Sequence, residues 1–252
     1  MRPVLSIQNL YKSFGGLQVV RNLSFDVPEG KATALIGPNG AGKTTVFNLI
    51  SGVYPVTSGC VRLRDQDITD LQSNRRIGRG LARSFQNIRL MPRLSVVDNL
   101  LVGQHATLSG PLDLLYPFRL FKRHEWTQAA EAELANHGLT KYAHEEVGSL
   151  PYGIRKRVDL IRATLASPSV LMLDEPAAGL NASETQELKM HLEVLRNRGM
   201  TLLIIEHDMH FIQSVCEKVV VLNFGGKIAE GTFDDVRSDQ QVREAYLGAE
   251  AA

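Results

Sequence analysis

Short runs of apolar residues, bounded by turn residues, alternate along the chain with stretches of helical periodicity. The clearest runs are Ala32–Ile36, Val170–Leu173, Thr201–Ile205 and Lys218–Leu222. Short runs that are apolar almost throughout are typical of strands buried on both faces of a parallel sheet. The pattern therefore predicts an α/β fold with a largely parallel sheet.

Two helical patterns follow such strands. The first is expected from about Gly42 to Ser51, where Gly52 supplies a stop. The second, Ala182 to Asn197, follows Asn181 and has Glu184 near its start, the spacing of a capping box. Alternation of these helices with the strands predicts a doubly wound core.

The first thirty residues have a different pattern. Leu5–Leu10, Leu17–Val20 and Leu23–Val27 are expected to form three short strands, joined by Gly15-Gly16 and by Asn22. Successive strands with short connections favour antiparallel pairing. A small antiparallel sheet is therefore predicted at the start of the chain.

Between Asn87 and Leu165 the pattern becomes helical, and residues 122–137 are rich in Glu, Ala and Gln. We interpret residues 1–252 as a single domain. Its α/β core and antiparallel sheet are expected to comprise residues 1–86 and 166–252. Residues 87–165 are expected to form a helical subdomain.

A phosphate-binding motif lies between the first predicted parallel strand and the helix after it. The residues that fit G-x-x-x-x-G-K-[ST] and continue into the helix are Gly37, Pro38, Asn39, Gly40, Ala41, Gly42, Lys43, Thr44 and Thr45. Glycines let successive N–H groups turn towards one anion, and the helix N-terminus adds partial positive charge. In such a motif Lys43 reaches the β- and γ-phosphates and Thr44 can ligate Mg²⁺. A glycine-rich turn is the alternative, but the strand and helix on either side favour binding of nucleotide phosphates with Mg²⁺. The motif alone does not separate kinases, GTPases, helicases and transport ATPases.

Two carboxylates follow the strand Val170–Leu173. In a phosphate-loop protein, acids at the end of a neighbouring strand lie beside the nucleotide, so Asp174 can hold Mg²⁺ through water. Glu175 can accept a proton from the attacking water. Without the upstream motif, an acidic turn after a strand would be an equally good interpretation.

Composition excludes several classes of protein. Lys and Arg number 28 against 27 Asp and Glu, so the formal net charge of +1 gives no strong field for nucleic acid. Cys60 and Cys216 are too few for a disulfide framework and favour a reducing compartment such as the cytoplasm. The start of the chain does not have the pattern of a signal peptide, and no apolar run approaches the ~20 residues of a membrane span. A membrane role would therefore require partner proteins.

The order of the motifs resembles that of ABC ATPases over essentially the whole chain. The phosphate loop is followed by Asp174-Glu175-Pro176, then Ala178-Gly179-Leu180-Asn181, then Ile205-Glu206-His207-Asp208. The resemblance implies a RecA-like core, an antiparallel β subdomain and an α-helical subdomain. It also implies that Tyr11 stacks on adenine, that Gln86 meets Mg²⁺ and the transporter interface, and that His207 contacts the γ-phosphate and helps to place the water.

The signature loop of that family corresponds here to Leu150, Pro151, Tyr152, Gly153 and Ile154. The usual pattern is Leu-Ser-Gly-Gly-Gln, so Pro151 and Ile154 depart from it; Pro151 has neither a hydroxyl nor an N–H to offer a phosphate. The N–H of Gly153 and the helix N-terminus remain. Residues 155–157, Arg-Lys-Arg, are expected on a solvated helix face. A signature that acts across a subunit boundary implies a head-to-tail dimer with a second ABC ATPase subunit, either a second copy or a paralogue.

Four stretches closely resemble ATP-binding subunits of bacterial high-affinity branched-chain amino acid importers: Arg83–Leu90, Leu94–His105, Glu230–Thr232 and Val242–Gly248. This resemblance implies integral membrane permeases as partners, a periplasmic binding protein acting indirectly, and a place on the inner face of the bacterial plasma membrane. Import of other amino acids, amides or urea, and lipopolysaccharide export, remain open. A nucleic-acid ABC ATPase is less favoured, because the chain has no second ATPase domain and no long coiled-coil insertion. A GTPase is also less favoured, since the Asn-Lys-x-Asp motif is missing, and a small-molecule kinase would leave the motif order unexplained.

Overall fold

The computed structural model describes residues 2–84, 88–105, 118–165 and 167–250. Its larger sheet has the strand order β10-β9-β3-β8-β7-β6. In chain order these strands are β3 (Ala32–Ile36), β6 (Leu81–Arg83), β7 (Val170–Asp174), β8 (Thr201–Ile205), β9 (Lys218–Asn223) and β10 (Gly226–Gly231). Strands β6 to β9 and β3 pair in parallel, and β10 pairs antiparallel with β9. The predicted α/β fold with a largely parallel sheet is confirmed.

The smaller sheet is antiparallel and has the order β2-β1-β4-β5. Its strands are β1 (Pro3–Phe14), β2 (Leu17–Pro28), β4 (Ser58–Leu63) and β5 (Gln66–Asp67). The sheet was predicted, but the break expected at Asn22 was wrong. Asn22 has φ 44 inside a continuous strand, where the register against β1 shifts. Asn tolerates the left-handed region, so the extra residue is absorbed as a bulge without ending the strand.

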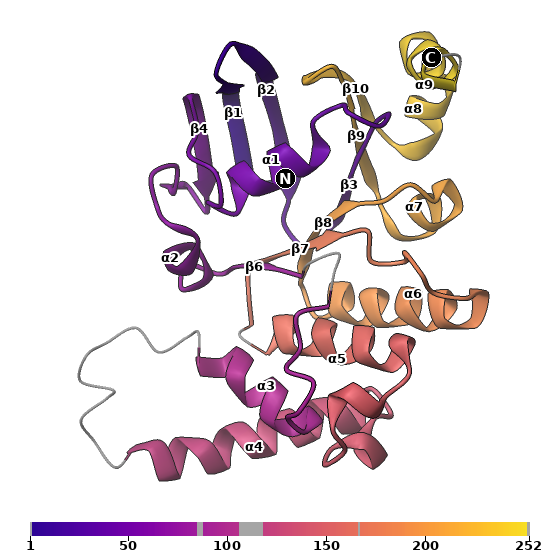
Figure 1. Cartoon of the computed structure of the whole chain (residues 1–252). Coiled ribbons are helices and arrows are strands. Elements are labelled where there is room, and N and C mark those ends of the chain that lie inside the picture. The colour runs from indigo at the N-terminus through magenta and orange to yellow at the C-terminus, as the bar shows by residue number, and fades with distance from the viewer. Residues whose placement is uncertain (1, 85–87, 106–117, 166, 251–252) are drawn as a thin grey trace.

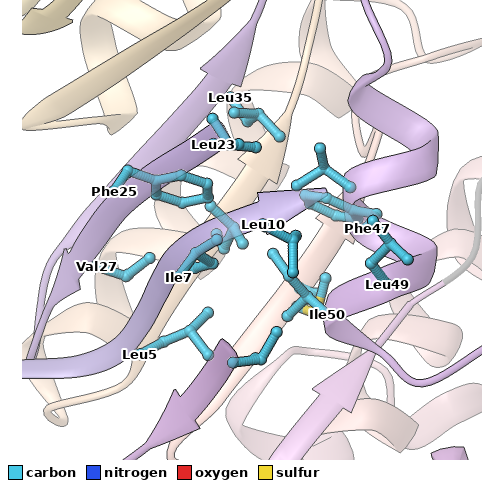
Figure 2. Close-up of a cluster of buried hydrophobic side chains, with 14 of the residues drawn as sticks. Leu5, Ile7, Leu10, Leu23, Phe25, Val27, Leu35, Phe47, Leu49 and Ile50 are labelled. Carbon is cyan, nitrogen blue, oxygen red and sulfur yellow. The ribbon is translucent and has the colours of Figure 1, made fainter. Parts of the chain in front are cut away.

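Two hydrophobic clusters cover the two faces of the parallel sheet. On one face, the antiparallel sheet packs over α1 (Lys43–Ile50), and Leu10 lies beside Phe47 and Ile50 (Figure 2). The other face is covered by α6 (Ala182–Asn197) and α7 (Met209–Val215). Alternate residues of each buried strand belong to opposite clusters, as the two-residue period of a strand requires.

The helices α3 (Val96–His105), α4 (Phe118–Asn136) and α5 (Tyr152–Thr164) share a third hydrophobic cluster of their own. They lie on the side of the parallel sheet opposite the antiparallel sheet (Figure 1). The remaining helices are α2 (Ser73–Ile77), α8 (Phe233–Ser238) and α9 (Gln240–Glu250), with short 3-10 turns at Thr140–Tyr142 and Val147–Ser149. Among the described residues, none of the helices combines the length and the apolar character that crossing a membrane requires.

Candidate functional site

The predicted phosphate loop joins β3 to α1. Gly37 has φ 151, and a Cβ atom there would lie 2.2 Å from the carbonyl oxygen of Leu222. Only glycine therefore fits at the start of the loop, where it passes close to β9. Of the predicted residues, Gly37, Pro38, Ala41 and Lys43 are buried, Gly42 and Thr45 are half-buried, and Asn39, Gly40 and Thr44 are exposed.

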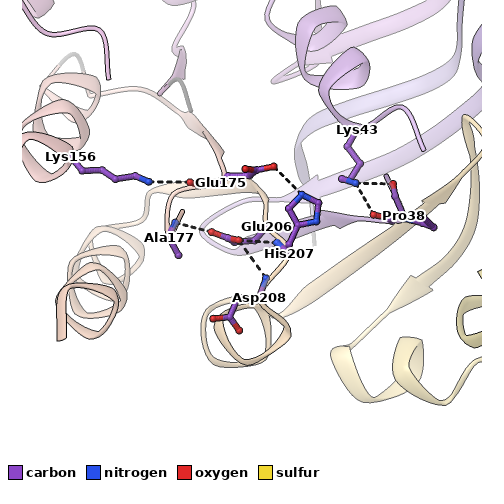
Figure 3. Close-up of polar contacts among 9 residues, drawn as sticks. Pro38, Lys43, Lys156, Glu175, Ala177, Glu206, His207 and Asp208 are labelled. Atoms are coloured by element: carbon purple, nitrogen blue, oxygen red, sulfur yellow. Dashed lines mark hydrogen bonds and ion pairs between the residues drawn. The ribbon is translucent and has the colours of Figure 1, made fainter. Parts of the chain in front are cut away.

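Lys43 lies inside this loop. Its Nζ donates to the carbonyl oxygens of Gly37 at 2.6 Å and Pro38 at 2.9 Å (Figure 3). Burial lowers the pKa of Lys43, and the charges of Glu175 and Asp174 act in the opposite direction. The loop thus places a cation where an incoming phosphate group can replace the two carbonyl contacts, as the loop sequence predicts.

Three neighbouring strands end at the same edge of the sheet. Leu35 of β3 pairs with Ile205 of β8, which pairs with Asp174 of β7. Because parallel strands end level with one another, the phosphate loop and the loops after β7 and β8 meet at this edge. The structure therefore brings the predicted residues Lys43, Asp174, Glu175 and His207 to one site.

Asp174 is buried and fixed by an ion pair. Its Oδ2 lies 2.8 Å from Nη2 of Arg83, whose Nη1 donates to Asn48 at 2.7 Å and Ser51 at 3.0 Å. Thr44 is in the first turn of α1 and is exposed. A carboxylate and a hydroxyl are oxygen ligands of the kind that Mg²⁺ prefers, so this donor set fits the metal. Gln86, the other predicted ligand, lies outside the described residues.

Glu175 and His207 form an acid–base pair beside the loop. Oε1 of Glu175 lies 2.9 Å from Nε2 of His207. Glu175 has φ 50, a left-handed conformation that costs a non-glycine residue about 1–3 kcal/mol. Its N–H donates to Ile205 at 2.9 Å, which ties the end of β7 to β8. Such strain is found where surrounding structure fixes a functional group, and here it orients the carboxylate towards His207.

Comparison with known proteins decides the family. A sequence model described as "ABC transporter" matches residues 20–178. The high-affinity branched-chain amino acid transport ATP-binding protein BraF of Pseudomonas aeruginosa is 41% identical to this chain, with 98% of each covered. The chain belongs to the ABC transporter family. Like other members it is a nucleotide-binding ATPase.

Further comparisons agree with this assignment. A second sequence model, described as "Branched-chain amino acid ATP-binding cassette transporter", matches residues 227–252. The high-affinity branched-chain amino acid transport ATP-binding protein LivG of Escherichia coli is 40% identical over 98% of each chain. The lipopolysaccharide export system ATP-binding protein LptB of the same species is 34% identical over 97% of each. A solved nucleotide-free ATP-binding cassette of an ABC transporter has a TM-score of 0.87 and 30% identity, covering 97% of this chain and 99% of that one.

The segment Leu150–Ile154, predicted as the signature loop, packs against its own chain. Leu150 is buried in the third cluster, and Pro151 is the N-cap of α5, without a side-chain hydrogen bond to the helix. Tyr152 is 39% exposed. Gly153 is buried so closely against Glu184 that a Cβ atom would lie 2.1 Å from its Oε1. Ile154 also packs against the third cluster, which explains an apolar side chain in place of the usual amide.

The prediction that residues 155–157 lie on a solvated face was wrong. All three side chains are half-buried. Nζ of Lys156 donates to the carbonyl oxygens of Glu175 at 3.2 Å and Ala178 at 2.7 Å, and Arg157 forms an ion pair with Glu187 at 2.8 Å. The sequence carried only a weak signal for Lys156, the apolar Leu160 four residues later on the same helix face, and its contacts with Glu175 and Ala178 were not visible in the sequence.

A second missed residue is Glu206, which is only 5% exposed. Its Oε1 accepts from the N–H of Ala177 at 2.7 Å, and its Oε2 accepts from the N–H of His207 at 2.8 Å. Glu206 therefore links the loop after β7 to the loop after β8. Its place between an apolar strand and His207 was visible in the sequence, but its hydrogen-bond partners were not.

Tyr11 is not on the side of the sheet that faces α1. Leu10 and Lys12 are buried, with Leu10 in the cluster that contains α1, so the two-residue period puts Tyr11 on the other face. Phe14 shares the face of Lys12, whose Nζ lies 4.7 Å from the Phe14 ring. Phe14 is 43% exposed and packs edge-on against the ring of Tyr54, with 5.3 Å between the ring centroids. Phe14 is thus an exposed aromatic on the α1 side of the same strand.

Proposed function

We propose that this chain is the ATP-hydrolysing subunit of an importer for branched-chain amino acids. The observation that carries the proposal is the match of residues 227–252 to the sequence model described for that class of transporter. This C-terminal segment also packs against the core, since Tyr246 lies against the hydrophobic cluster that includes α6 and α7, and burial raises the pKa of Tyr246 to about 12. Relatives named for this cargo are 39–41% identical to the chain.

In the proposed reaction, Lys43 and the N–H groups of the phosphate loop bind the β- and γ-phosphates of ATP. Glu175 accepts a proton from the attacking water, whose oxygen forms a bond to the γ-phosphorus as the bond to the bridging oxygen of ADP breaks. His207 orients Glu175 and the γ-phosphate. Mg²⁺, when bound, supplies positive charge at the phosphate oxygens, and Asp174, Thr44 and Gln86 would hold it.

We further propose that one chain does not complete the site. The N-terminal turn of α5 carries the N–H of Gly153 and no side-chain cap, so it suits an anion presented by a second subunit. Two ABC ATPase subunits, a pair of copies or this chain with a paralogue, would then enclose two nucleotides head to tail. Integral permeases would hold the pair at the cytoplasmic face of the plasma membrane, with a periplasmic binding protein delivering cargo and no role for nucleic acid.

Lipopolysaccharide export is the second candidate, because LptB is 34% identical over 97% of each chain. A strain in which the gene for this chain has been deleted distinguishes amino acid import from lipopolysaccharide export. Uptake of labelled leucine should be lost, should return with the wild type and with Lys141→Ala, an exposed control, and should stay lost with Lys43→Ala. Normal uptake in the deletion, or arrest of lipopolysaccharide export, would contradict the proposal.

A further inference from the structure

The segment after β7 carries Glu175 and takes an unusual path. Glu175 has φ 50, and the N–H of Ala178 returns to the carbonyl of Glu175 at 3.2 Å to close a turn. A strained conformation persists only where neighbouring groups over-determine it. The question is which groups hold these four residues, Glu175 to Ala178, in place.

Two charged side chains supply the contacts. Lys156 of α5 approaches from one side and donates to the carbonyl of Glu175 (Figure 3). It also donates to the carbonyl of Ala178. Glu206 approaches from β8 and accepts from the N–H of Ala177 (Figure 3). Together with the hydrogen bond from the Glu175 N–H to Ile205, these contacts bind both N–H and carbonyl groups of the turn.

Glu206 also binds the backbone of His207, the residue paired with Glu175. Its other oxygen accepts from the backbone N–H of His207 at 2.8 Å and, more weakly, of Asp208 at 3.5 Å. One buried carboxylate therefore spans the loops that carry Glu175 and His207, whose side chains meet at 2.9 Å. A shift of Glu206 would move the two loops relative to each other and change that distance.

We infer that Lys156 and Glu206 are positioning residues for ATP hydrolysis, holding Glu175 and His207 in the geometry that activates water. We call them the positioning pair. The inference rests on the proposed role of Glu175 as base. Lys156 and Glu206 attract each other, and burial lowers the pKa of Lys156, as expected for charges held away from water. Because Lys156 lies one turn after Gly153, the same helix joins the signature segment to the base of its own subunit.

The chemistry of Glu206 gives a sharp test. Both of its oxygens accept from N–H groups, and an amide has one oxygen and one NH₂ group, so Glu206→Gln directs a donor at a donor. We expect kcat for ATP to fall about tenfold or more in Glu206→Gln and in Lys156→Met, with KM within about twofold, because substrate-binding groups are untouched. Lys156→Arg, which can donate to the same carbonyls, should recover most of kcat. Glu193→Gln, an exposed carboxylate on α6, is the matched control.

Amide hydrogen exchange tests the hydrogen bonds of Glu206 directly, without requiring ATP hydrolysis. In nucleotide-free protein, Glu206→Gln should speed exchange at the N–H of Ala177 or His207 about tenfold, with the unfolding midpoint near that of the wild type. Unchanged exchange and unchanged kcat would overturn the positioning role. The positioning role would also be overturned if kcat of Glu206→Gln fell together with an equal loss of ATP binding and a lower unfolding midpoint. A wild type that exchanges as described but hydrolyses no ATP would instead contradict the proposed function and leave the positioning contacts established.

Discussion

At the scale of single residues, the site depends on side chains whose directions are set by the backbone. Glu175 faces His207 because of its left-handed φ, and Lys43 faces the loop carbonyls because Gly37 lets the loop pass close to Leu222. The same reasoning applies to adenine recognition. Because side chains alternate along a strand, Tyr11 and Phe14 lie on opposite faces of β1. Replacing them is therefore expected to have different effects on ATP affinity.

We expect Phe14→Ala to weaken ATP binding about fivefold to tenfold, because stacking on an aromatic ring is worth about 1–3 kcal/mol per base. Tyr11→Ala, on the opposite face of β1, should bind ATP as the wild type does. Titration calorimetry with a non-hydrolysable ATP analogue measures both. A loss confined to Tyr11→Ala would support the original expectation from family resemblance and exclude Phe14.

Motifs formed by contiguous residues were the most predictable part of the site. Lys43, Asp174 and Glu175 could be named because each follows a buried strand within a short recognisable segment. The positioning pair could not, because the contact of Lys156 with Glu175 joins residues 19 apart and depends on how α5 meets the sheet. Gln86, Thr44 and the signature residues keep their proposed roles as predictions.

At the scale of elements, the turn between β9 and β10 supports the phosphate loop from outside the nucleotide site. The N–H of Gly225 donates to Ala41 at 3.0 Å, and its carbonyl accepts from Arg21 at 2.8 Å. Gly225 has φ 81, and a Cβ atom there would lie 2.2 Å from the carbonyl oxygen of Val19. The neighbouring Gly226 has no atom closer than 3.8 Å to its Cβ position.

Gly225→Ala should therefore push β2 and the phosphate loop apart. We expect the free energy of unfolding to fall by about 1–3 kcal/mol, and ATP affinity to fall several-fold although no nucleotide contact has changed. Gly226→Ala should stay within about 0.5 kcal/mol of the wild type. Urea unfolding and ATP titration check both variants, and equal responses of the two glycines would show that the turn does not support the loop.

Elements with a strong pattern were located almost to the residue. Ala32–Ile36, Thr201–Ile205 and Ala182–Asn197 have the bounds that the sequence predicts, since each combines a continuous apolar pattern with clear turn or cap residues. The strand Leu81–Arg83 was missed because it is too short to show a period. The sequence predicts a turn at Asn22, where the strand instead has a bulge, because asparagine is common in both.

At the scale of the whole molecule, distant segments meet at one sheet edge. Arg83 and Asp174 form the buried ion pair across 91 positions of sequence, a contact that local pattern cannot indicate. The fold class was nevertheless predictable from the alternation of strands and helices. The division of the chain into a core and residues 87–165 stays a prediction, although α3, α4 and α5 have their own hydrophobic cluster.

The central claim is that Glu175 is the base of a site completed by a second subunit. It is tested most directly by hydrolysis and molecular mass of the wild type and Glu175→Gln with Mg-ATP. The variant should lose hydrolysis by about a hundredfold or more, because general-base catalysis typically contributes 10²–10⁴-fold, and should form a dimer only when ATP is present. Full hydrolysis by the variant would exclude Glu175 as the base, and a monomer at saturating ATP would contradict pairing between copies of this chain.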